Sequence, residues 1–335
     1  MRIAVDAMGG DFAPAEIVKG ACEAAAAFPD IEVLYLVGDR EAVQRELDRQ
    51  KQVPPAIQVV HSDEVIGMGE APASAVRRKK KSSINLAVDL VKTGEAQAVF
   101  SAGNTGAAVA AGQLKLRTLE GVIRPGIATV FPSPTKPFVL IDAGATPDAI
   151  PESLMQFAIM GSVYSREILG VAQPKVGLMS IGEEDAKGNE VTKETFHLLQ
   201  QAPIDFVGNI EGHDLFEGHV DVVVCDGFVG NVILKTSESV GHAIVTWIKH
   251  EFVRNPIRIL GAILLRGALK SLKKKVNPES YGGAPLLGVK GTVLIGHGSS
   301  SHVAAFHGIR SARDAVKHHV NEAIVKAIAT AQTSG

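Results

Sequence analysis

The sequence predicts an α/β protein built on a doubly wound, mainly parallel sheet, and three observations lead to this class. Short runs rich in Val, Ile and Phe alternate with Ala-, Leu-, Lys- and Glu-rich segments along most of the 335 residues, as they do when helices cover both faces of a parallel sheet. Hydrophobic residues make up 46% of the chain and aromatic residues only 5%, so the apolar mass is aliphatic, which is typical of buried parallel strands. Many of the 34 glycines directly follow a strand-like run.

The elements alternate in a regular order. We expect strands at residues 2–6, 32–37, 57–60, 96–101, 127–131, 138–142, 175–181, 204–209, 220–225 and 292–296. Helical spacing of apolar residues predicts helices between them, among them residues 14–27, 39–50, 84–93, 105–116 and 151–169. No repeat or low-complexity linker divides the chain, so residues 1–335 are expected to form one α/β unit, in which two lobes remain an alternative.

Composition excludes several classes of protein. The net charge of −2 argues against a nucleic-acid-binding protein. Cys22 and Cys225 lie far apart in apolar surroundings, which favours free thiols in a reducing cytoplasm over a disulfide. The N-terminus runs straight into a strand, so no signal peptide is expected, and no apolar run reaches the roughly 18 residues that a membrane span needs.

Glycine- and asparagine-rich loops follow the predicted strands. In an open α/β sheet a ligand binds outside the carboxyl ends of the strands, and glycine amides at the start of a helix favour an anion. We therefore expect an anion site, for phosphate above all, at this edge. At residues 101–106 the loop opens directly into a helix, where Asn104 or Thr105 serves either as N-cap or in ligand binding. The loops lie at residues 6–11, 101–106, 142–146, 182–189, 208–212, 226–231 and 296–301.

Named nucleotide and metal motifs are missing from the sequence. There is no G-x-x-x-x-G-K-[ST], no G-x-G-x-x-G after a strand and no G-x-S-x-G, so nucleotide binding and α/β-hydrolase chemistry are unsupported. His and Cys spacings predict no metal site, and we expect no cofactor. Lys187, among the acids of loop 182–189, either balances those acids or contacts an anionic substrate or developing oxyanion.

Two basic segments break the near-neutral charge. Arg77, Arg78 and Lys79 begin a run of five cations, which is either a solvated face or a docking site for an acidic macromolecule. Residues 254–277 hold seven cations and no acid, and we expect a protruding amphipathic helical arm there. Such a basic, apolar arm is typical of contact with an anionic membrane, although a dimer interface remains open. Its predicted membrane-facing residues are Ile257, Leu260, Leu264, Leu269, Leu272 and Lys273.

Taken together, these stretches resemble the bacterial phosphate acyltransferases of phospholipid synthesis, the PlsX family. The resemblance includes K-G-N-E at residues 187–190 and D-G-F-V-G-N at residues 226–231, and it spans essentially the whole chain in the family's order. No single stretch is decisive, but the set is highly specific. The matching stretches are residues 5–11, 101–107, 142–145, 160–165, 187–190, 226–231, 281–284 and 297–300.

The resemblance implies a function and a set of partners. The expected enzyme moves a fatty acyl chain from acyl carrier protein to inorganic phosphate, giving acyl phosphate. It is expected to share the fold of phosphotransacetylases and of isocitrate and isopropylmalate dehydrogenases, to act as a homodimer and to bind the cytoplasmic membrane face peripherally. A coenzyme A-dependent phosphotransacylase, a decarboxylating dehydrogenase of the same fold and a non-enzymatic lipid-binding scaffold remain alternatives.

Site roles follow from the resemblance and from the chemistry of the loops. The resemblance implicates Lys187 and Asn231 in catalysis, and Lys187 or His297 is expected to assist the departing thiolate. Backbone amides of two loops are candidates for holding phosphate. The expected phosphate- or substrate-binding residues are Asp6, Gly9, Gly10, Asp11, Gly103, Asn104, Thr105, Asp226, Ser299 and Ser300.

Overall fold

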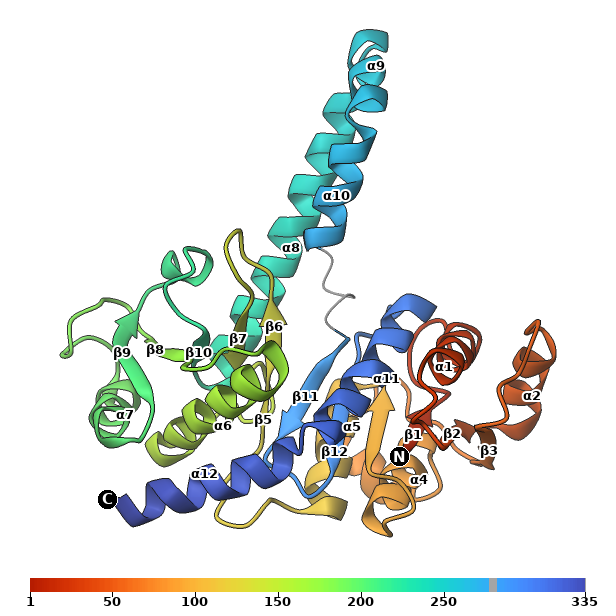
Figure 1. Cartoon of the computed structure of the whole chain (residues 1–335), viewed down its shortest axis with the longest axis horizontal. Helices are drawn as coiled ribbons and strands as arrows, with labels where there is room; N and C mark the ends of the chain where they lie inside the picture. The colour runs from red at the N-terminus through yellow and green to blue at the C-terminus, as the bar shows by residue number, and fades with distance from the viewer. Residues whose placement is uncertain (277–281, 335) are drawn as a thin grey trace.

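The protein is an α/β structure with two sheets. The computed structural model describes residues 1–276 and 282–334, with the side chains of residues 1–271 and 282–333. Within this part of the chain, the strands form a seven-stranded and a five-stranded sheet, each with packed helices (Figure 1). The expected α/β class, with mainly parallel strands, is confirmed, but its strands are divided between two sheets. Tyr281 of the family-like stretch at 281–284 lies outside the described residues.

The seven-stranded sheet is formed by the first strands of the chain, β1 to β5, and by the last two, β11 and β12. Its order is β3-β2-β1-β4-β12-β11-β5, and it is parallel except where β11 pairs with β12 and β5. Because Asp6 pairs with Val37, and Ile295 with Ser101, the ends of four neighbouring strands lie level at one edge. The strands are β1 (Arg2–Asp6), β2 (Val33–Gly38), β3 (Ile57–His61), β4 (Ala98–Ser101), β5 (Gly126–Ile127), β11 (Ala284–Leu287) and β12 (Thr292–Ile295).

Helices cover both faces of this sheet, as a doubly wound fold requires. On one face α1 (Ala15–Ala27), α2 (Arg40–Asp48) and α11 (His302–Lys317) bury residues such as Ile17, Val43 and Ile309 against the strands. On the other face Ile84 and Val109 pack in a second core. The elements of that face are α3 (Pro72–Arg78), α4 (Ser83–Lys92), α5 (Thr105–Ala111) and the π-helical segment η1 (Gly112–Leu116).

The five-stranded sheet has the order β6-β7-β10-β8-β9, with β6 antiparallel to β7 and the rest parallel. Its main core contains Phe157 of α6, Leu199 of α7 and Ile324 of α12. The strands are β6 (Thr129–Phe131), β7 (Phe138–Ile141), β8 (Lys175–Met179), β9 (Asp205–Ile210) and β10 (Val222–Val224). The helices are α6 (Pro151–Leu169), α7 (Glu190–Gln201), the short 3₁₀ helix η2 (Asp214–Phe216) and α12 (Val320–Ser334).

The division into two sheets occurs inside one predicted strand. The strand expected at 127–131 is split at Ala128, because Ile127 pairs with Leu286 in one sheet and Thr129 pairs with Leu140 in the other. The chain returns through β11, which was not expected, and α12 finally crosses to pack on α6 (Figure 1). The segment expected to form a single strand therefore contributes one short strand to each sheet and connects the two sheets.

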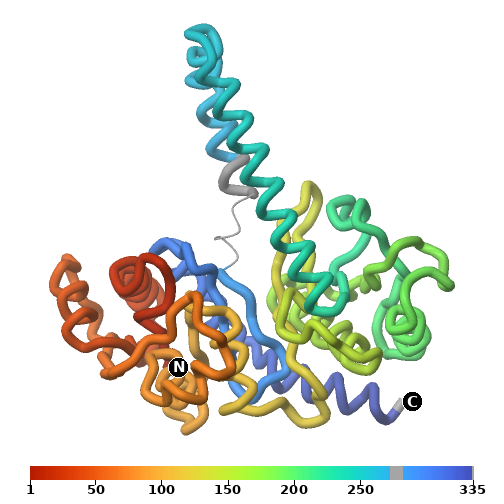
Figure 2. The backbone as a smooth tube through the Cα atoms, turned by 180° about the vertical axis from the view of Figure 1, so that it is seen from behind, coloured from red at the N-terminus to blue at the C-terminus, as the bar shows by residue number. Residues whose placement is uncertain are grey.

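A helical arm leaves the body at the end of β10. It consists of α8 (Gly227–Phe252), α9 (Pro256–Leu264) and α10 (Arg266–Val276), and α10 returns beside α8 (Figures 1 and 2). The described part of the predicted arm, residues 254–276, is thus its outer and returning part, and residue 277 lies outside the described residues. Helix α8, which we did not assign to the arm, is the other half. No helix in the described part of the chain is both long and apolar enough to cross a membrane.

Apolar side chains of the arm are exposed. Ile257 is 83% exposed, Leu264 78% and Trp247 68%, and α9 buries none of its residues. Leu260 is also exposed and Leu269 is half-buried, whereas the side chains of Leu272 and Lys273 lie outside the described ones. The arm as described therefore presents an uncovered apolar surface.

Candidate functional site

Three of the predicted loops meet at the carboxyl edge of the seven-stranded sheet. They follow β1, β4 and β12, which are neighbours in the sheet. The amide of Asp11 donates to the carbonyl of Gly298 at 2.8 Å, and Ser101 Oγ lies 2.7 Å from Asp6 Oδ2. We expected all seven loops at one edge; these contacts bring three of them together, whereas the other four follow strands of the five-stranded sheet.

Glycine is required where the loops touch. A Cβ on Gly9 would lie 2.7 Å from the nitrogen of Gly103 and 2.8 Å from Asp6 Oδ2, closer than real Cβ atoms approach. Gly10 has a φ of +111°, which other residues rarely adopt. The glycines of this loop therefore allow two backbone segments to come into direct contact, which brings their amides to one place.

Asp6 lies beneath these loops and is 3% exposed. Its carboxylate accepts a hydrogen bond from Ser101 and a longer one, at 3.3 Å, from the amide of Met8. Burial raises the pKa of Asp6, and hydrogen bonds from Ser83 and Ser101 oppose that rise. A cavity of about 10 Å³ adjoins it, room for little more than a water-sized group. This geometry gives Asp6 a positioning role for the loops, whereas direct contact with substrate stays a prediction.

Asn104 is the N-cap of α5, so the capping alternative is confirmed. Its Oδ1 accepts from the amide of Ala107 at 3.0 Å. Its Nδ2 donates to the carbonyls of Met68 at 3.0 Å and Glu70 at 3.2 Å. One side chain therefore caps the helix and holds the 67–70 turn over the loops, while Thr105 is exposed at the helix start.

The basic segment at 77–81 lies beside the same turn, and most of its cations are paired. Glu70 forms ion pairs with Lys79 at 2.6 Å and with Arg78 at 3.0 Å, and the hydrogen bond from Lys79 is the main reason that the pKa of Glu70 is lowered. Lys81 pairs with Asp63. Arg77 is exposed and forms no ion pair with any described residue. Of the three predicted docking residues, Arg77 is thus the one that presents an unpaired charge.

The loop after β12 carries the last residues of this group. His297 Nδ1 lies 2.8 Å from the exposed Ser299 Oγ, and the buried Ser300 Oγ donates to the carbonyl of His297 at 2.5 Å. The imidazole of His297 is exposed. The loop therefore fixes an accessible imidazole and a hydroxyl side by side.

A second group of loops lies at the five-stranded sheet. Asp226 caps α8 by accepting from the amides of Phe228 and Val229, both at 2.9 Å, so its carboxylate has a structural role there. Asn231 is exposed on the first turns of α8, and a Cβ on Gly144 would lie 3.6 Å from its Cβ. The loop after β7 and the start of α8 therefore form one packed unit.

Asp142 organises this second group, and we did not select it as a site residue. It is fully buried, and its carboxylate accepts four backbone amides, those of Ile127, Gly144, Ala145 and Thr146, at 2.6–2.9 Å. Burial raises its pKa, and these amides oppose the rise. An aspartate directly after an apolar strand and two residues before a glycine was the signal that would have identified it.

Lys187 lies in the loop between β8 and α7. Its side chain is 50% exposed, and its Nζ is 4.0 Å from Glu184 Oε2. Asn209 Nδ2 donates to the carbonyl of Glu184 at 2.9 Å, which holds the loop against the end of β9. Among the described residues, no hydrogen bond joins Lys187, Asn231 and His297, which lie on the loop after β8, the first turns of α8 and the loop after β12. The predicted catalytic trio is therefore not assembled by direct contact.

The fold is similar to that of two kinds of solved enzyme structure. A phosphotransacetylase from Streptococcus pyogenes matches with a TM-score of 0.64 at 15% identity, over 95% of this chain and 94% of that one. A 4-hydroxythreonine-4-phosphate dehydrogenase from Klebsiella pneumoniae matches with a TM-score of 0.51 at 14% identity, over 93% and 96%. At such identities the likeness concerns the fold alone, and it confirms the predicted phosphotransacetylase- and dehydrogenase-like architecture.

Sequence relatives are much closer. The family described as "Fatty acid synthesis protein" matches residues 1–323. A phosphate acyltransferase from Desulfitobacterium hafniense is 51% identical over 327 residues, 97% of each chain. Another from Pelotomaculum thermopropionicum is 49% identical over 335 residues, 100% of this chain and 97% of the relative. The chain therefore belongs to the phosphate acyltransferase family, and it is an enzyme that transfers acyl groups.

Proposed function

We propose that the enzyme transfers a fatty acyl group from acyl-acyl carrier protein to inorganic phosphate, giving acyl phosphate for phospholipid synthesis. The observation that carries this proposal is the meeting of the β1, β4 and β12 loops at one edge of the seven-stranded sheet. A second observation is the exposed cation Arg77 on α3. Glycine-rich loops suit a phosphate ion, and a basic surface suits an acidic carrier protein. Residues 1–335 act as one catalytic unit in this proposal, with the arm at 254–277 as its membrane-facing part.

In the proposed reaction an oxygen of hydrogen phosphate attacks the thioester carbonyl carbon. A C–O bond forms, the C–S bond breaks, and the proton carried by hydrogen phosphate ends on the carrier thiol. The enzyme has to orient phosphate against the carbonyl and stabilise the tetrahedral oxyanion. We assign phosphate orientation to the loops that carry Gly9, Gly10 and Asp11 and residues Gly103–Thr105, with Ser299 and Ser300 beside them. The amides of Asp11 and Gly103 already donate to the Gly298 carbonyl and to Ser101 Oγ, so their part is to hold the two loops in place.

The remaining roles concern the oxyanion and the leaving thiolate. Lys187 or Asn231 donates to the oxyanion, and Lys187 or His297 delivers the proton to sulfur. The exposure of all three side chains is compatible with access by a substrate that reaches both loops and the start of α8. Loss of turnover in Lys187→Ala and Asn231→Ala with unchanged folding tests these roles, and retention of turnover in both refutes them.

The helical arm supports a further part of the proposal. Its exposed apolar side chains and its cations suit peripheral contact with an anionic membrane on the cytoplasmic side. The same uncovered surface suits pairing with a second copy, so we propose a homodimer as well. Sedimentation of the full chain with and without anionic vesicles measures both states.

The decisive experiment is a thiol-release assay. Acyl-acyl carrier protein is incubated with the enzyme, with and without phosphate, and free carrier thiol is measured. We expect release that depends on phosphate and that is faster with the carrier protein than with acyl-coenzyme A. If acyl-coenzyme A is turned over as fast or faster, coenzyme A is the acyl carrier of the reaction. If thiol is released equally well without phosphate, phosphate is not the acyl acceptor.

A further inference from the structure

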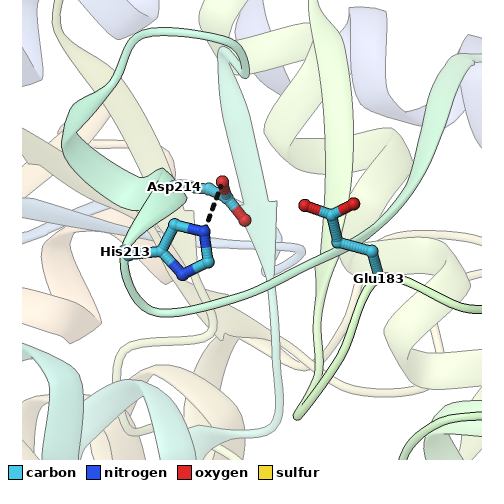
Figure 3. Close-up of side chains that lie close together, drawn as sticks. All are labelled: Glu183, His213 and Asp214. Carbon is cyan, nitrogen blue, oxygen red and sulfur yellow. Dashed lines mark ion pairs between the residues drawn. The ribbon is translucent and has the colours of Figure 1, made fainter.

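Two loops at the five-stranded sheet bring together an imidazole and two carboxylates (Figure 3). Glu183 follows β8, and His213 and Asp214 lie at the start of η2, after β9. One ligand atom from each residue lies within 4.8 Å of the other two. In Figure 3 the carboxylate of Asp214 lies between the imidazole and Glu183. This grouping is separate from the β1, β4 and β12 loops.

The imidazole is placed between two carboxylates. His213 Nε2 is 3.4 Å from Asp214 Oδ1, and His213 Nδ1 is 3.9 Å from Glu211 Oε2. Histidines that bind a metal through one ring nitrogen usually direct the other toward a carboxylate or carbonyl, which fixes the tautomer. The ring of His213 thus has a second candidate metal ligand, the Asp214 carboxylate, near Nε2. The Glu211 carboxylate can accept a hydrogen bond from Nδ1 after a small rotation of the side chain.

The cluster is also held by the backbone. Asp214 Oδ2 accepts from the amide of Glu211 at 2.7 Å, which orients the carboxylate. The loop of Glu183 is held to the end of β9, which leads into the 211–214 turn, by the hydrogen bond from Asn209 Nδ2 to the Glu184 carbonyl at 2.9 Å. Ligands that come from segments already fixed to one another lose little freedom when an ion binds.

We infer that Glu183, His213 and Asp214 form a binding site for a divalent transition-metal ion, with zinc as the best fit. An imidazole nitrogen with two carboxylates suits zinc, whereas magnesium and calcium prefer oxygen ligands alone. Two carboxylates also balance the charge of a divalent ion, and water completes the coordination because Glu183 and His213 are exposed. No spacing in the sequence predicted this site, since Glu183 is distant from His213 along the chain.

A bound ion would join the loop that carries Lys187 to the 211–214 turn. Lys187 lies four positions after Glu183, and its amide donates to the carbonyl of Glu184 at 2.9 Å. The ion would also lower the negative charge of a loop that contains Glu183, Glu184 and Asp185. Any effect of this on turnover rests on the proposed function, but the binding of the ion does not.

The test is a calorimetric titration of the chelator-treated, full-length enzyme with ZnCl₂. We expect saturation at one ion per chain, weakened at least about tenfold in His213→Ala and in Glu183→Gln. His219→Ala is the matched control, because His219 is an exposed histidine paired with Glu217 outside the cluster. Circular dichroism establishes that each variant is folded. Absence of saturable binding below about 1 mM, or equal binding by His213→Ala and His219→Ala, overturns the inference.

A second measurement follows the loops directly. Zinc should slow amide hydrogen exchange in residues 182–189 of the wild type and leave the exchange rate of these residues unchanged in His213→Ala. Equal slowing in both proteins would contradict the inference that the ion joins this loop to the 211–214 turn. If neither the wild type nor any variant releases thiol in a phosphate-dependent way, but the wild type still binds zinc, the proposed function is refuted and the metal site is retained.

Discussion

The hydrogen bond between Ser101 and Asp6 joins the ends of β4 and β1, and Ser101→Ala tests its importance. Ser101 is 2% exposed, and its Oγ lies 2.7 Å from Asp6 Oδ2 and accepts from the Gly103 amide at 3.2 Å. The substitution removes one donor from a buried carboxylate and one acceptor from a buried amide. Leaving such a group unsatisfied costs about 1–3 kcal/mol, so we expect the free energy of unfolding to fall by about that amount.

The assay combines denaturant unfolding with steady-state kinetics. Because the Gly103 amide loses its fixed partner, the KM for phosphate should rise more than kcat falls. Ser74→Ala is the matched control, since Ser74 is exposed and donates to the Ala71 carbonyl at 3.3 Å. Stability and KM equal to those of Ser74→Ala would refute the reasoning. In an Asp6→Asn background the cost of Ser101→Ala should shrink, because an amide is less costly to leave buried than a carboxylate.

Four further outcomes are expected. Burial raises the pKa of Asp6, so the stability advantage of the wild type over Asp6→Asn is full below about pH 4 and falls as the pH rises through the folded-state pKa; unfolding midpoints that show a growing advantage contradict this. Asn104→Ala should lose about 1 kcal/mol as a cap and raise the KM for phosphate. Arg77→Glu should raise the KM for carrier protein at low salt, and Lys51→Glu should not. Leu264→Glu should reduce flotation with anionic vesicles, unlike Val53→Glu, which changes an exposed valine outside the arm.

Local signals predicted the regular elements well. The helix expected at 151–169 is α6, because Pro151 occupies its first turn and Gly170, with a φ of +72°, ends it. The helix expected at 105–116 is regular only to Ala111 and continues as a π-helical segment. The strand β11 escaped notice because Ala284–Leu287 is short and contains Pro285, and its pairing with two other strands is not local information.

The site was predictable to the extent that it follows from strand ends. The loops after β1, β4 and β12 meet because parallel strands end at one edge, which the strand and loop pattern indicates. The pairing of Lys79 and Arg78 with Glu70 was not predictable, since it depends on the path of the 67–70 turn. For the same reason, the division of the loops between two sheets required the structure, because the crossover at Ala128 is decided by its strand partners.

The arm and the second group of loops share one helix, α8, so the surface proposed to contact the membrane and Asn231 belong to the same arm. α8 begins at the Asp226 cap, carries Asn231 on its first turns and extends for 26 residues, or about 39 Å at 1.5 Å per residue. Its base is fixed, because the amide of Gly227 donates to the Thr146 carbonyl at 2.9 Å. We expect a ligand that tilts the exposed end of α8 to pivot the helix about this base and so to shift Asn231 relative to Gly144. Substitutions at the tip should therefore change turnover as well as membrane partition, whereas a tether without mechanical linkage would change partition alone.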